Sequence, residues 1–100
     1  MSDWLNLLGL AMRAGSVITG EEPVLRTVRS GDVALVILAA DAGPNTKKKV
    51  SDKCASYRIP LIQISSRQQL GHALGKAERV VIAVTDPGFA RTIRDRVSSH

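Results

Sequence analysis

The residues of this chain that could catalyse a reaction are few, and their spacing does not suit catalysis. Glu21 and Glu22 could act as a general acid and base, but nothing in the sequence shifts the pKa of two adjacent carboxyls in a surface loop. The histidines, His72 and His100, have no Asp, Cys or Ser at a spacing typical of a catalytic pair. We therefore expect a protein that is not an enzyme and takes no small-molecule substrate.

No nucleotide or metal site is expected either. Residues 71–77 resemble a phosphate-binding P-loop, but three residues separate the glycines where a P-loop has four, and Ala77 replaces the Ser or Thr that binds magnesium. The single cysteine, Cys54, has no Cys or His neighbour at metal-ligand spacing and is predicted to be buried in a helix. The prediction is that the protein needs no cofactor.

The charge of the chain favours an acidic partner. Lys and Arg outnumber Asp and Glu by 14 to 9, for a net charge of +5, which suggests nucleic acid, although charge that only maintains solubility would look the same. The aromatic residues Trp4, Tyr57 and Phe89 all occupy positions typical of a core, so none is left to stack on unpaired bases. A nucleic-acid partner would then be held by loops, helix starts and basic side chains, which suits a folded RNA.

The length and composition predict a single domain over residues 1–100. A hydrophobic content of 44% in 100 residues supports one core, and no apolar run approaches the roughly 18 residues of a membrane span. The first residues lack the positive segment and small-residue cleavage site of an export signal. We expect a cytoplasmic protein with no membrane partner.

Residues 33–40 predict the central strand, because they are apolar without alternation and are bounded by turn residues, as in a strand covered on both faces. Helices are predicted at 3–14, 23–30, 44–57, from Ser65 or Ser66 to about 75, and from 87, with strands at 17–18, 60–64 and 80–84. This alternation indicates an α/β protein with a three-layer α/β/α sandwich. The strand order stays open.

The start of the second helix has two interpretations. Thr19 with Glu22 matches a capping box, but Pro23 would then stand at the fourth helical position, where its missing N–H matters. We prefer Pro23 as the first helical residue, with residues 20–22 as an exposed loop. Arg26 and Arg29 then share the outer face of this helix.

The helix at 44–57 is predicted to bury Val50, Cys54 and Tyr57 and to expose its lysines. Several lysines near one helix start oppose the positive end of the helix dipole, so something other than helix stability favours them. These lysines are Lys47, Lys48, Lys49 and Lys53.

Short motifs in a fixed order run along the whole chain. They are Gly15-x-x-x-x-Gly20-Glu-Glu, Arg26 with Arg29 and Gly31, Ala39-Ala-Asp41 with Pro44-Asn-Thr, Cys54, Pro60, Leu70-Gly71-x-Ala-x-Gly75-Lys76, and Val84-Thr-Asp86 with Gly88-Phe89. The ordered set resembles the ribosomal-protein family named for archaeal L7Ae, whose members bind kink-turn RNA.

The resemblance implies a three-layer α/β/α sandwich with a four-stranded mixed sheet. It also implies an RNA-binding site made of three loops at one end of the sheet, at residues 20–26, 41–46 and 75–79. Since the third loop precedes its strand while the other two follow theirs, the strand at 80–84 must then run antiparallel to its neighbours. The RNA-binding residues that the resemblance implies are Gly20, Glu21, Glu22, Arg26, Arg29, Asp41, Asn45, Lys47, Lys76 and Ala77.

The ligand that the resemblance implies is a sharply bent RNA duplex with tandem sheared G·A pairs, which expose guanine N–H donors. Where the family usually has Asn, Glu and, one turn later, Lys, this chain has Glu22, Pro23 and Arg26. Glu22 can accept two guanine donors and Arg26 keeps the charge, whereas Pro23 can do neither. In the third loop, charged residues leave Ala77 as the only apolar contact.

We therefore expect a non-enzymatic RNA-binding protein that recognises structured RNA such as ribosomal RNA and associates with the ribosome. The alternative is a protein-interaction adaptor on the same fold with only nonspecific RNA affinity, because the altered loops no longer match the family's base-reading set. A third possibility is a detached recognition domain of an RNA-modifying enzyme. On the non-binding interpretation, Glu21 and Glu22 only stabilise a helix start, and Arg26 and Arg29 form a solvated face.

Overall fold

The apolar run at 33–40 supplies the second strand of a four-stranded sheet in the computed structural model, which describes residues 3–98. His100 lies outside the described residues. The elements are α1 (Asp3–Arg13), β1 (Val17–Thr19), α2 (Glu21–Ser30), β2 (Leu35–Leu38), α3 (Pro44–Tyr57), β3 (Leu61–Gln63), α4 (Arg67–Ala73), β4 (Val81–Val84) and α5 (Pro87–Ser98).

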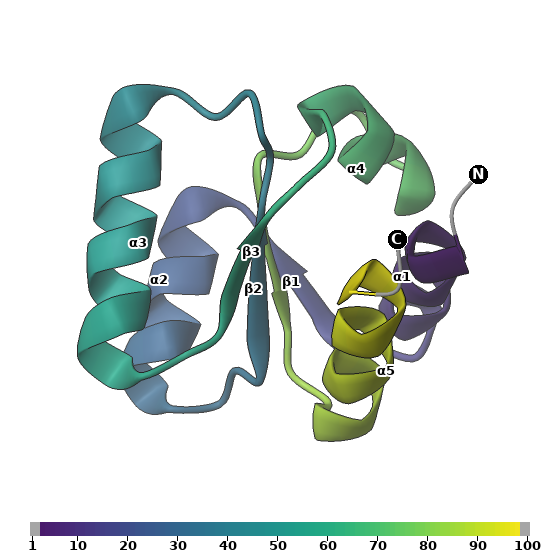
Figure 1. The fold of residues 1–100 in the computed structure, drawn as a ribbon, viewed down its shortest axis with the longest axis horizontal. Coiled ribbons are helices and arrows are strands. Elements are labelled where there is room, and N and C mark those ends of the chain that lie inside the picture. The colour runs from purple at the N-terminus through teal and green to yellow at the C-terminus, as the bar shows by residue number, and fades with distance from the viewer. Residues whose placement is uncertain (1–2, 99–100) are drawn as a thin grey trace.

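The sheet has the strand order β1-β4-β2-β3. β2 pairs in parallel with β3, and β4 pairs antiparallel with both β1 and β2. α2 and α3 cover one face of this sheet, and α1, α4 and α5 cover the other (Figure 1). The predicted α/β/α sandwich with a mixed sheet is confirmed, and so is the antiparallel direction of the strand at 80–84.

β2 explains why residues 33–40 show no alternation of apolar and polar residues. Successive side chains of a strand point to opposite faces, and here both faces are covered by helices. Leu35 and Ile37 pack into the core beneath α1, α4 and α5, whereas Val36 and Leu38 pack into the core beneath α2 and α3. All four side chains are fully buried.

α2 begins at Glu21, so the predicted start at Pro23 and the exposed loop at 20–22 are wrong. Gly20 is the N-cap, with φ of 99°, and its carbonyl accepts the first helical hydrogen bond from the N–H of Val24. Pro23 is therefore the third helical residue, where an N–H would have no acceptor within the helix. The proline ring removes no helical hydrogen bond at that position. The helix can therefore begin at Glu21, two residues before the predicted start.

Tyr57 was predicted to face inward, and this is wrong because 44% of it is exposed. The chain reverses after α3 at Arg58, which has a left-handed φ of 58°. The next residue, Ile59, donates its N–H to the carbonyl of Cys54 and packs against the core beneath α2 and α3. The other two aromatic residues do contribute to the core: Trp4 is buried, and Phe89 is partly buried against the same cluster.

Among residues 3–98, no helix is both long enough and apolar enough to cross a membrane.

Candidate functional site

The three predicted loops meet at one edge of the sheet, the upper edge in Figure 1. β1, β2 and β3 end at this edge, and β4, which runs in the opposite direction, begins there. The loops at residues 20–26, 41–46 and 75–79 are therefore neighbours in space, although 48 residues of the chain separate the first loop from the third.

A groove of about 730 Å³ lies between these loops. Its walls combine the start of α2, the start of α3, the first residue of α4 and the segment that leads into β4. The lining residues are Thr19, Gly20, Glu21, Gly43, Thr46, Arg67, Glu78, Arg79, Val80 and Val81.

Glu21 joins the first loop to the second. The hydroxyl of Thr46 donates a hydrogen bond of 2.8 Å to Glu21 Oε1, and Lys49 Nζ lies 3.5 Å from Glu21 Oε2. Both carboxylate oxygens therefore already have partners within the protein. Glu21 holds the start of α2 against the start of α3 and fixes one wall of the groove.

Glu22 lies on a different side of α2 from the groove. It lines a second hollow, of about 400 Å³, between α2 and α3. Its exposed carboxylate has no hydrogen bond or ion pair with any of residues 3–98, so its two oxygens are available as acceptors. We call this second hollow the α2–α3 hollow; its lining residues are Glu22, Leu25, Arg29, Lys49, Asp52, Lys53 and Ser56.

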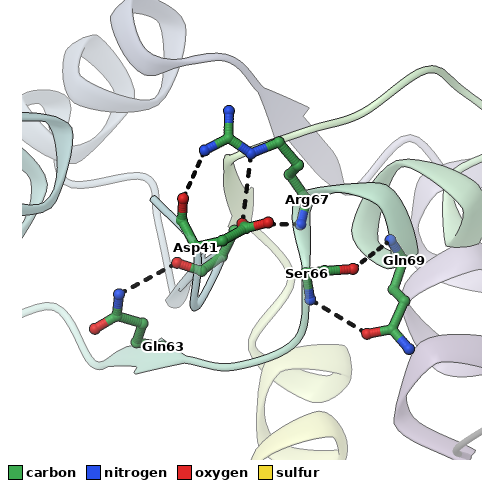
Figure 2. Close-up of polar contacts among 6 residues, drawn as sticks. Asp41, Gln63, Ser66, Arg67 and Gln69 are labelled. Atoms are coloured by element: carbon green, nitrogen blue, oxygen red, sulfur yellow. Dashed lines mark hydrogen bonds and ion pairs between the residues drawn. The ribbon is translucent and has the colours of Figure 1, made fainter. Parts of the chain in front are cut away.

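Asp41 is engaged by Arg67, as Figure 2 shows. Arg67 Nη2 donates a hydrogen bond of 2.6 Å to the carbonyl oxygen of Asp41, and the backbone N–H of Arg67 donates one of 3.1 Å to Asp41 Oδ1. Arg67 Nε also lies 3.5 Å from Asp41 Oδ1. Asp41 therefore ties the loop after β2 to the start of α4, and Arg67 is held in a defined position at the groove.

The local sequence places Arg67 at the first position of α4. Ser66 is the N-cap, and its hydroxyl accepts from the N–H of Gln69 while the Gln69 side chain accepts from the N–H of Ser66 (Figure 2). The predicted capping pattern of this helix is thus confirmed, with Ser66 and Gln69 as its two members. The carbonyl of Arg67 accepts from the N–H of Arg79, which joins α4 to the third loop.

The third loop presents Glu78 and Arg79 to the groove rather than Lys76 and Ala77. Arg79 Nη1 donates to the carbonyl oxygens of Glu78, at 2.9 Å, and Ala77, at 3.3 Å, so the guanidinium is oriented by its own loop. Lys76 and Ala77 are exposed and do not line the groove.

The third loop packs closely against α4 through a backbone contact. A Cβ on Gly71 would lie 2.0 Å from the carbonyl oxygen of Ala77, so only glycine allows α4 and the loop to approach this closely.

The remaining predicted residues do not line the groove. Arg26, Arg29, Asn45 and Lys47 are all exposed, the first two on α2 and the others in the first turns of α3. Arg29 belongs to the α2–α3 hollow. Of the ten predicted residues, the structure brings only Gly20 and Glu21 into the groove itself.

Eight of the ten groove residues were not among the predicted site residues, and those with a polar or charged side chain are Thr19, Thr46, Arg67, Glu78 and Arg79. Arg67 had a detectable signal, because it directly follows a capping Ser, and the start of a helix that follows a parallel strand lies at the sheet edge where that strand ends. Thr46, Glu78 and Arg79 fall inside the predicted loops, but their orientation depends on contacts with distant residues.

No group of three or more His, Cys, Asp or Glu within residues 3–98 is arranged to hold a metal ion. Cys54 is buried, as predicted, and burial raises the pKa of its thiol.

The chain is similar in sequence to several characterised proteins. It is 48% identical to the RNA-binding protein YlxQ of Bacillus subtilis, over 91% of each chain. It is 41% identical to the RNA-binding protein YlxQ of Enterococcus faecium, over 93% of this chain and 89% of the relative. It is 36% identical to the large ribosomal subunit protein eL30B of Schizosaccharomyces pombe, over 81% of this chain and 71% of the relative.

Solved structures share the fold. A protein of unknown function from Bacillus halodurans superposes with a TM-score of 0.96 at 53% identity, covering 98% of this chain and 99% of the other. The 15.5 kDa RNA-binding protein of Giardia lamblia superposes with a TM-score of 0.82 at 24% identity, covering 95% of this chain and 82% of the other. The second similarity, at that identity, concerns the fold.

The model of one protein family, described as the ribosomal protein L7Ae/L30e/S12e/Gadd45 family, matches residues 2–94. The match spans all nine described elements except the last turn of α5. The family's relatives named above are RNA-binding or ribosomal proteins and not enzymes, which confirms the prediction of a non-enzymatic protein. Together with the relatives at 36 to 48% identity, this match shows that the chain belongs to the L7Ae/L30e/S12e/Gadd45 family of ribosomal proteins.

Proposed function

We propose that this protein binds structured RNA and that the bent backbone of the RNA lies in the groove between the three loops. The observation that carries the proposal is the assembly of one groove from three loops that are distant in the chain, each tied to the next by side-chain or backbone hydrogen bonds. The relatives named RNA-binding protein YlxQ support it. A preassembled groove of this kind recognises shape, which is how folded RNA is commonly distinguished.

The two cations of the groove, which also contains the carboxylates of Glu21 and Glu78, suit phosphates. Arg67 and Arg79 both line it, and hydrogen bonds to backbone carbonyls orient both guanidinium groups before any ligand arrives. An oriented guanidinium loses less side-chain entropy on binding than a free one, and its planar donors match phosphate oxygens. A bent duplex brings several phosphates close together, which is where fixed cations are most useful.

Glu22 and Arg26 supply the finer part of the proposal, which is recognition of a kink-turn with tandem sheared G·A pairs. Glu22 has two free acceptor oxygens at the start of α2, in the α2–α3 hollow, and these suit the two N–H donors of a guanine edge. Arg26, one turn further along the same helix, contacts an adjacent phosphate. Lys76 lies at the exposed rim of the third loop and adds a further phosphate contact.

Ribosomal RNA in the cytoplasm is the partner that we propose. The relatives include large ribosomal subunit proteins, and the net charge of +5 favours a polyanion. Sequencing of the RNA that copurifies with the protein from cells would identify the partner.

A binding experiment with two RNAs tests the proposal. One RNA is a duplex kinked by tandem G·A pairs, and the other has the same sequence except that Watson–Crick pairs replace them. We expect fluorescence anisotropy to show tighter binding to the kinked RNA at every salt concentration. Equal affinity for the two RNAs would contradict the proposal and would leave only nonspecific charge attraction, as expected of a protein-interaction adaptor.

A further inference from the structure

The α2–α3 hollow adjoins the groove at the start of α2 and carries cations that form no ion pair among residues 3–98. The ion pair between Glu21, which lines the groove, and Lys49, which lines the hollow, marks the place where the two surfaces meet. Beyond it, Arg29 on α2 and Lys53 on α3 form no ion pair with any of residues 3–98.

The acidic residues around the hollow do not cancel these two cations. Glu21 is already paired with Lys49, and Asp52 is paired with Lys48, at 3.3 Å. Glu22 is the remaining carboxylate, and it lies at the groove end of the hollow, seven residues from Arg29 in the same helix. The hollow is thus acceptor-rich next to the groove and positively charged further along the two helices.

From this arrangement we infer that a stem of the bound RNA continues past the bend and lies along the α2–α3 hollow, with Arg29 and Lys53 contacting its phosphates. The inference rests on the proposed function, because a base contact by Glu22 requires RNA over this end of α2. Seven helical residues span about 10 Å, which corresponds to roughly three base pairs of stem. The partner of this surface is therefore the sugar-phosphate backbone of a duplex, without dependence on its sequence.

Stem length provides the test. Three kinked RNAs share the same bend. The first has two long stems, and in each of the other two a different stem ends two base pairs beyond the bend and is closed by a tight hairpin loop. The double variant Arg29→Gln, Lys53→Gln removes both cations and keeps side chains that favour helix. Arg91→Gln, Arg94→Gln is the matched control, because it removes two exposed arginines from α5 on the other face of the sheet.

We expect the Arg29, Lys53 variant to bind the long RNA about three- to tenfold more weakly than the wild type does. When the stem that lies along the hollow is the shortened one, the variant and the wild type should bind with equal affinity. The variant's salt slope on the long RNA should fall by about two units, one for each lost phosphate contact. The α5 variant should show no dependence on stem length.

Two results would overturn the inference: an equal loss on long and short RNAs, or no loss on either. A circular dichroism melt of each variant shows whether a loss on both reflects unfolding. The wild-type comparison of kinked and Watson–Crick RNAs is independent of these variants. A protein that prefers kinked RNA but shows no length effect would keep the proposed function and lose this inference.

Discussion

Thr46 and Glu21, which are 25 residues apart in the chain, meet where the hydroxyl of Thr46 donates a 2.8 Å hydrogen bond to the Glu21 carboxylate. The two residues belong to the first turns of α3 and α2. This bond, with the neighbouring Lys49, makes the beginnings of the two helices one unit. The geometry of the groove wall therefore depends on this one contact between two side chains.

Removing this hydroxyl should weaken both the fold and the groove. Thr46→Val keeps the shape and leaves one Glu21 oxygen without its donor, so we expect the free energy of unfolding to fall by about 1 kcal/mol and the preference for kinked RNA to decrease. Urea denaturation and anisotropy measure the two effects. Thr92→Val is the control, because the Thr92 hydroxyl donates only to the carbonyl of Gly88, in an exposed hydrogen bond within α5. A loss as large in Thr92→Val would show that the Glu21 contact has no special role.

Substitutions of Glu22 and Arg26 should change the salt dependence of RNA affinity in different ways. Glu22→Ala removes acceptors for bases and should lower the preference for kinked over Watson–Crick RNA while the salt slope changes little. Arg26→Ala removes a phosphate contact and should weaken both RNAs and flatten the slope by about one. Anisotropy titrations at several salt concentrations separate the two. If Glu22→Ala instead tightened binding to both RNAs equally, the carboxylate would be acting only by repelling phosphates.

Arg67 should contribute more to stability than a typical surface cation. Arg67→Ala loses the 2.6 Å bond to the carbonyl of Asp41 and the ion pair with its carboxylate, so we expect a loss of about 1 kcal/mol in the free energy of unfolding. Lys48→Ala, which breaks an exposed pair with Asp52 within one helix, should cost about 0.3 kcal/mol. Urea denaturation compares them, and equal costs would refute the anchoring role of Arg67.

Gly71 should not tolerate even a methyl group. In Gly71→Ala the new Cβ would lie 2.0 Å from Ala77 O and 2.8 Å from Glu78 Cα, both backbone atoms, so α4 and the third loop must move apart. We expect a loss of about 3 kcal/mol in the free energy of unfolding. Gly43→Ala is the matched substitution, because no atom lies within 4 Å of its Cβ, and it should cost less than about 1 kcal/mol. Thermal melts of the two variants should differ clearly; similar melting temperatures would contradict the close approach at Gly71.

Cys54 should make stability fall at alkaline pH. Burial raises the pKa of its thiol above the ordinary value of about 8.5, so the folded state keeps a proton that the unfolded state has lost. At a pH below the pKa of the thiol in the unfolded state, the thiol is protonated in both states and does not affect stability. Above that pH, the free energy of unfolding declines until the pH reaches the pKa of the thiol in the folded state. Urea denaturation between pH 7 and pH 10 should show a decline that Cys54→Ala reduces. An identical decline in the variant would place its cause in other groups.

The helices and strands of this fold are predictable from residue types wherever the decisive contacts are local. The apolar run at 33–40 predicts a strand covered on both faces, and Ser66 predicts a helix start because its hydroxyl bonds to an N–H group three residues away. The family resemblance added the mixed sheet and the direction of the strand at 80–84, which periodicity left open.

Which side chains line the groove follows from contacts between distant parts of the chain. Glu21 and Glu22 are adjacent in the chain, yet one is bound to Thr46 and Lys49 in the groove wall and the other points toward the α2–α3 hollow. Which residue turns inward depends on where α2 begins, and that depends on Gly20, whose N–H bonds to Val81 in a strand 61 residues away. Arg67 likewise owes its role to Asp41. Such contacts join residues far apart in the chain, and no local pattern of residue types encodes them.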